Sequence, residues 1–188
     1  MPDAELHLRQ LPDLLRAFDP PVDPRVLALV DEEHGRWRAL HDRLVALLVQ
    51  LLDVASDGRP VTEVITRLIE DTSVGIDDLL DPGAGTGVDA AEIAALLRAH
   101  GSLGTVAVDG PVTTFRHACG SGGRHWAANP DVTTVAEGEV PGMPGGRPRY
   151  CARCVTSIRA HAGDAWTVAP PEAPGQPCTW TVTNPPPP

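Results

Sequence analysis

The chain has 188 residues, 42% of them hydrophobic, so it is long enough to bury a core of its own. All fifteen basic residues are arginine, and the lack of lysine excludes a P-loop, the Schiff-base chemistry of pyridoxal phosphate and the lysine-dependent kinase mechanism. The net charge of −10 falls on residues 1–103, where nineteen acidic residues face nine arginines, so this half is a poor surface for nucleic acid.

A long helix is predicted in the first half of the chain. Asp23 is a typical N-cap, Pro24 suits the first helical position, and the pattern stops at Gly58. Within this helix, mostly apolar residues recur at every seventh position in two series. The first is Val30, Trp37, Leu44 and Leu51, and the second, three positions further on, is Glu33, Leu40, Leu47 and Val54. Such spacing predicts packing against another helix, either within the chain or in a second copy or another protein.

Two further helices are expected before residue 103. Apolar residues recur with helical spacing through residues 60–72. Asp89 and Glu92 then form a capping box, and the helix that they begin should end near Gly101.

Residues 79–87, LLDPGAGTG, together with the helix after them and a strand that ends in an acid, resemble the opening of a class I S-adenosylmethionine-dependent methyltransferase. The resemblance implies a parallel sheet and a cofactor site. Its residues would be Asp81, Gly83, Gly85, Gly87 and Asp109.

A second interpretation of this stretch is a connector between helices. Leu79 and Leu80 continue the helical spacing of Ile76, and Asp109 is followed by a glycine, as in a hairpin turn. We favour the connector, formed by residues 82–87, and keep the methyltransferase as an alternative function.

After residue 104 the pattern changes to short strands. A hairpin is predicted around Asp109 and Gly110, and residues 133–140, 165–169 and 178–183 are further strand candidates. Frequent proline and glycine predict irregular structure without a clear helix, and residues 184–188 are expected to form a polyproline tail.

Cysteine and histidine spacing gives the strongest chemical signal. Cys151 and Cys154 form a C-x-x-C pair, and His117 and Cys119 lie at the end of the predicted hairpin. Two such knuckles resemble a zinc ribbon, and Gly120 could take the positive φ that a knuckle needs. The sequence therefore predicts a structural Zn²⁺ bound by His117, Cys119, Cys151 and Cys154, with His125 or Cys178 as the alternative fourth ligand.

These expectations combine into an α+β protein with two parts. Residues 1–103 would form an acidic helical bundle, and residues 104–183 a small β-rich, zinc-ribbon-like module. With no catalytic residues identified, we expect a non-enzymatic interaction or assembly protein that binds its partner through Val30, Trp37, Leu44 and Leu51.

A nucleic-acid-binding protein is the other alternative function. It would use the arginines of the second part, namely Arg147, Arg149, Arg153 and Arg159. The start of the chain lacks a secretory signal, and no apolar run reaches the length of a membrane span, so a cytoplasmic location without membrane contact is expected.

Overall fold

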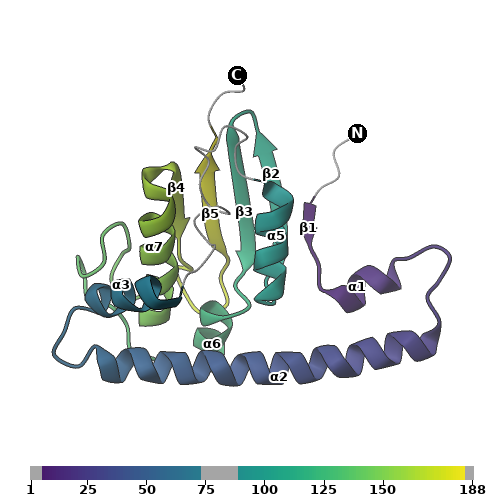
Figure 1. The fold of residues 1–188 in the computed structure, drawn as a ribbon, viewed down its shortest axis with the longest axis horizontal. Coiled ribbons are helices and arrows are strands. Elements are labelled where there is room, and N and C mark those ends of the chain that lie inside the picture. The colour runs from purple at the N-terminus through teal and green to yellow at the C-terminus, as the bar shows by residue number, and fades with distance from the viewer. Residues whose placement is uncertain (1–5, 73–88, 185–188) are drawn as a thin grey trace.

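The computed structural model describes residues 6–72 and 89–184, and it combines helices with one antiparallel sheet (Figure 1). The expected α+β class is therefore confirmed. The predicted connector at 82–87 and the tail at 185–188 lie outside the described residues. None of the described helices has both the length and the hydropathy that crossing a membrane requires.

Five strands form the sheet in the order β1-β2-β3-β5-β4, and every neighbouring pair is antiparallel. The strands are β1 (Leu6–Leu8), β2 (Leu103–Asp109), β3 (Val112–Ala118), β4 (Trp166–Ala169) and β5 (Cys178–Thr183). The β2–β3 hairpin turns at Gly110, whose φ of 55° suits a residue without a side chain. This confirms the hairpin and the last two strand candidates.

Two helices, α5 (Ala90–Ala99) and α7 (Arg149–Ala162), cover one face of this sheet. Helices α3 (Val61–Thr72) and α6 (Gly122–Ala128) both contact α7, and a short 3₁₀ turn (Gly163–Ala165) follows it. In Figure 1, α5 lies over β2 and α7 over β4, and the same pairs are in contact. The carboxylate of Asp89 accepts hydrogen bonds from the N–H groups of Ala91 and Glu92, so the predicted cap of α5 forms.

The long helix α2 (Pro24–Ala55) runs along the base of the molecule, below the sheet and its covering helices (Figure 1). Its N-cap is Asp23, which accepts a 2.7 Å hydrogen bond from the Arg25 N–H, as predicted. At 1.5 Å per residue, α2 is about 48 Å long. The short helix α1 (Leu11–Arg16) packs against its first half, where one guanidinium nitrogen of Arg16 donates to both carboxylate oxygens of Asp31.

Residues from both parts of the chain share one hydrophobic core. Ile65 on α3 and Ile93 on α5 belong to the same buried cluster as Phe115 on β3 and Val155 on α7. The predicted boundary between 103 and 104 falls inside β2, and β1 from the first part pairs with β2. The sheet is thus built from both parts.

Two predictions for the second part are wrong. A regular helix, α7, spans fourteen residues where irregular structure was expected. Residues 133–140 form no strand and contribute only an isolated bridge between Thr134 and Pro148. The apolar side chains of Cys151, Val155 and Ile158 recur with helical spacing and face the core, which explains why a helix forms there.

Candidate functional site

The predicted structural zinc site does not form. Among the residues that the structure describes, no group of three or more histidine, cysteine or acidic side chains could hold a metal ion. The prediction of a zinc ribbon, and of Zn²⁺ as cofactor, is therefore wrong, both for His117, Cys119, Cys151 and Cys154 and for the alternates His125 and Cys178.

The local structure explains this error. Cys151 and Cys154 lie in the first turns of α7, where the i and i+3 positions of a helix replace the tight loop of a zinc knuckle. Cys151 and Cys178 are buried members of the hydrophobic core, and burial raises the pKa of both thiols far above the usual range. His125 lies on α6, where its side chain contacts that of Asn129.

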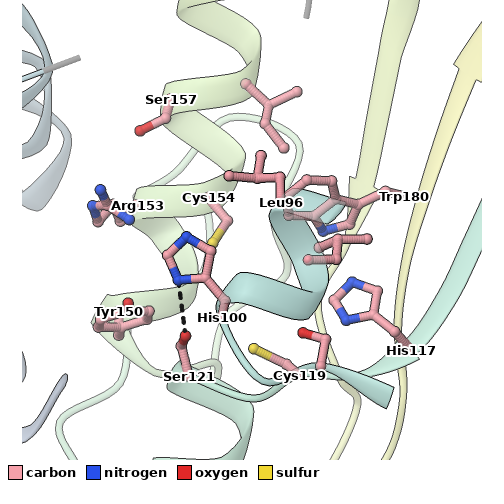
Figure 2. Close-up of a pocket in the computed structure, with 13 residues that line it drawn as sticks. Leu96, His100, His117, Cys119, Ser121, Tyr150, Arg153, Cys154, Ser157 and Trp180 are labelled. Atoms are coloured by element: carbon pink, nitrogen blue, oxygen red, sulfur yellow. Dashed lines mark hydrogen bonds between the residues drawn. The ribbon is translucent and has the colours of Figure 1, made fainter. Parts of the chain in front are cut away.

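Three of the proposed ligands instead line a pocket of about 110 Å³ between α5, α7 and the sheet (Figure 2). They are His117, Cys119 and Cys154. The remaining lining residues come from α5 and the turn after it, the start of α6, α7 and β5, namely Leu96, Leu97, His100, Ser102, Ser121, Tyr150, Arg153, Ser157, Ile158 and Trp180.

The glycines of the CGSGG stretch bring the walls of this pocket together. A Cβ added at Gly120 would lie 2.2 Å from the His100 carbonyl oxygen, and one at Gly122 would lie 2.3 Å from the Tyr150 ring. The φ of Gly120 is not positive, so close backbone approach, rather than the predicted knuckle geometry, requires this glycine. Its N–H donates a 3.1 Å hydrogen bond to Ser102 Oγ.

Ser121 lies between two histidines at one end of the pocket. Its Oγ is 3.2 Å from His41 Nε2 on α2 and 3.5 Å from His100 Nδ1 (Figure 2). Burial is the main cause that lowers the pKa of both imidazoles, and Arg38 adds to the effect on His41. Both rings are therefore neutral at pH 7 and can accept the hydroxyl proton.

A serine beside a neutral histidine is one part of a nucleophilic site. Asp42 Oδ1 is 3.7 Å from His41 Nδ1, which is longer than a hydrogen bond. The Ser121 hydroxyl links α2, the turn after α5 and the turn before α6.

His117 is one of the most deeply buried polar side chains in the pocket wall. It is 2% exposed, and burial lowers its pKa to about 4. Neither ring nitrogen has a hydrogen-bond partner among the described residues, and the same holds for Nε1 of Trp180. The two rings meet edge to face with centroids 5.7 Å apart.

The residues implied by the methyltransferase resemblance do not meet in a described site. Asp81, Gly83, Gly85 and Gly87 lie outside the described residues. Asp109 is exposed at the end of β2, at the hairpin turn. The described strands pair antiparallel throughout, whereas the resemblance implies a parallel sheet.

The four arginines that a nucleic-acid-binding function would use make separate contacts. Arg149 pairs with Asp53 at 3.5 Å, Arg159 pairs with Asp164 at 3.4 Å, and Arg153 lines the pocket. Arg147 is half-buried and reaches the Gly145 carbonyl. They do not form one open basic surface.

The predicted helical seam is exposed on α2. We define the α2 seam as Leu40, Leu44, Leu47, Leu51 and Val54, each of which is between 52% and 76% exposed. The opposite side of the same helix carries Val45, Val49 and Leu52, which are buried against the body. Val30 and Trp37 continue the seam toward α1 and are half-buried.

In comparisons with known proteins, no family model, curated protein or solved structure matches this chain.

Proposed function

We propose that this protein is a non-enzymatic assembly protein that binds a second copy of itself through the α2 seam. The observation that carries the proposal is the exposure of five large apolar side chains with 4-3 spacing on one side of a helix whose other side is already packed. A contiguous apolar patch of this kind on a folded chain marks an interaction surface, and its spacing suits another helix.

Self-complementarity favours a second copy over an unrelated partner. If two α2 helices run antiparallel with Leu44 opposite Leu47, then Leu40 faces Leu51 and Trp37 faces Val54. Each of these contacts occurs twice about a two-fold axis, as in an isologous interface. Every member of the α2 seam is then paired with an apolar residue.

Charge also favours the antiparallel arrangement. In a parallel pair, Glu33 would face its own counterpart across the seam, and two like charges in a coiled-coil core are unfavourable. In the antiparallel pair, Glu33 lies beyond the end of the partner helix, and Arg36 approaches Asp57 of the other copy. Glu33 thus disfavours the parallel orientation of the two α2 helices.

Sedimentation equilibrium of the full chain tests the proposal. The wild-type protein is expected to be a dimer. Leu44→Glu places two buried charges in each dimer and should weaken it at least about 100-fold, because the central contact is lost on both sides of the two-fold axis, at about 2 kcal/mol each. The matched control is Val108→Glu, which adds the same charge at an exposed apolar position on β2. A monomeric wild-type protein, or a Leu44→Glu variant that dimerises as well as the control, would refute the second-copy partner.

The orientation has its own test. Glu33→Leu should tighten a parallel dimer by about tenfold or more, since it replaces a charge pair with an apolar contact. It should change the dissociation constant of an antiparallel dimer by less than about threefold.

We propose the cytoplasmic location that the sequence predicts, in which the four free cysteines stay reduced.

A further inference from the structure

We propose that the pocket between α5, α7 and the sheet binds a small organic anion, a short-chain carboxylate that carries a hydrogen-bonding group such as a carbonyl oxygen at its other end. This ligand site is independent of the α2 seam, which lies on the side of α2 that faces away from the body.

The first argument is the unsatisfied hydrogen-bonding capacity of His117. The residue is 2% exposed and lines the pocket, yet neither ring nitrogen is paired within the described residues. A buried polar group without a partner costs about 1–3 kcal/mol, and such groups normally contact another protein group, a water or a ligand. Trp180 Nε1, in the same wall, approaches the Cys178 thiol without a hydrogen bond of good geometry to any described residue, and it adds a second donor. This end of the pocket therefore suits a ligand with an acceptor oxygen.

The second argument is charge. Among the described residues that line the pocket none is acidic, and Arg153 is the one side chain with a permanent charge. Arg153 has no hydrogen bond or ion pair to another described residue. Burial raises the pKa of Cys154 to about 11 and of Tyr150 to about 12, so these two groups are neutral at pH 7. The pocket is thus positive, and an anion is the complementary ligand.

The third argument is the arrangement and size of the pocket. Figure 2 shows Arg153 on one side of the pocket and His117 and Trp180 on the other, with Leu96 between them. The volume of about 110 Å³ is somewhat smaller than the roughly 150 Å³ cavity that accommodates benzene. The ligand is therefore a chain of a few carbon atoms, with its carboxylate at Arg153 and its oxygen near His117 and Trp180.

Isothermal titration calorimetry with three related probes tests this inference. The probes are 4-oxopentanoate, which has both polar ends, pentanoate, which lacks the carbonyl group, and pentan-2-one, which lacks the carboxylate. We expect 4-oxopentanoate to bind with one site per chain. Pentanoate and pentan-2-one should each bind at least about tenfold more weakly, because each leaves one buried or charged group without its partner.

Two variants assign the two ends of the pocket. Arg153→Gln should weaken 4-oxopentanoate at least about tenfold and leave pentan-2-one unchanged. Trp180→Phe keeps an aromatic ring but removes the N–H donor, so it should weaken 4-oxopentanoate and leave pentanoate unchanged. Arg159→Gln is the matched control, since Arg159 lies on the same helix outside this pocket.

Three results would overturn the inference. They are the absence of saturable binding for all three probes, equal binding of 4-oxopentanoate and pentan-2-one, and equal loss of binding in Arg153→Gln and Arg159→Gln. A pocket that holds only water would show no saturable binding. Because sedimentation is measured without probe, failure here leaves the dimer proposal unaffected.

Discussion

His117 on β3 combines nearly complete burial with an ionisable ring, and this combination has a consequence for stability. An imidazole in an apolar wall resists protonation because the charged form loses its hydration. The unfolded chain pays no such cost, so it binds a proton at a higher pH than the folded protein. Folding and protonation at His117 therefore oppose each other.

We predict that stability falls as the pH is lowered from 6.5 to 4. The folded pKa of His117 is about 4 and the unfolded value is near 6.5, so its contribution is fully present above pH 6.5 and is lost as the pH falls toward 4. The difference corresponds to about 3 kcal/mol. Urea denaturation at several pH values should give a shallower pH dependence for His117→Leu than for the wild type, although His41 and His100 still contribute in the same direction.

The control for this experiment is Phe115→Leu, which replaces a fully buried ring on the same strand and removes no titratable group. It should keep the wild-type pH dependence. If His117→Leu shows the same slope as the wild type between pH 4 and 6.5, the ring is either solvated or charged in the folded protein.

At the scale of single elements, α2 is positioned by polar contacts near its middle. Arg38 donates hydrogen bonds of 3.1 Å to the carbonyl oxygens of Gly101 and Gly120, and its guanidinium also lies over the Trp37 ring. These carbonyls belong to the turns that lead into β2 and α6. The contacts hold α2 against two turns of the body, and they leave the α2 seam facing solvent.

Replacing Arg38 should therefore loosen α2. We predict that Arg38→Met destabilises the protein by about 1–3 kcal/mol, because two carbonyls in a poorly hydrated site lose their charged donor. The control Arg36→Met removes a side chain that is 66% exposed and pairs with Glu32 and Glu33, and it should cost less than about 1 kcal/mol. The free energies of unfolding come from urea denaturation, and equal losses in the two variants would contradict the role of Arg38.

A second prediction concerns Gly35 in the interior of α2. A Cβ at this position would meet no atom within 4 Å, so the only effect of adding one is on helix propensity. Gly35→Ala should stabilise the protein by about 0.5–1 kcal/mol. The contrasting variant is Gly120→Ala, whose Cβ would clash with backbone atoms at 2.2 Å and which should be strongly destabilising. Thermal denaturation should show a higher melting temperature for Gly35→Ala and a lower one for Gly120→Ala than for the wild type.

The comparison of α2 with α7 explains which elements the sequence could predict. The caps and the heptad spacing of α2 are local signals, and both are present in the structure. Cys151 and Cys154 also follow local spacing, but i and i+3 suit a helix as well as a zinc knuckle, and only tertiary packing decides between them. Residue type alone predicts the zinc motif, although Val155 and Ile158 continue the helical face that begins at Cys151.

The pocket could not be found from the sequence for a related reason. Its walls come from α5, α7, β3, β5 and the turn before α6, which only the sheet order brings together. The stretch CGSGG carried a usable signal, since three glycines beside one serine indicate close backbone packing. That no described residue pairs with the ring nitrogens of His117 is visible only in three dimensions.

At the scale of the whole molecule, one core joins residues from both predicted parts. Val61 and Ile65 on α3 and Ile93 on α5 are fully buried in the same cluster as Phe115 and Val182 in the sheet. A β-rich part on its own would expose the apolar face that α3 and α5 cover. In the same way, the first part on its own would lose the strands that β1 and α5 contact.

We therefore predict that the full chain unfolds in a single cooperative transition. Far-ultraviolet circular dichroism follows mainly the helices, and tryptophan fluorescence follows Trp126, Trp166 and Trp180 in the second part and Trp37 on α2. The two signals should give the same urea midpoint and the same slope, as two-state unfolding requires. Leu52→Ala, which truncates a fully buried α2 side chain, should lower both midpoints equally and cost about 2–5 kcal/mol. Two separate midpoints, with only the helical signal shifted by Leu52→Ala, would instead show that residues 1–103 and 104–183 are independent domains.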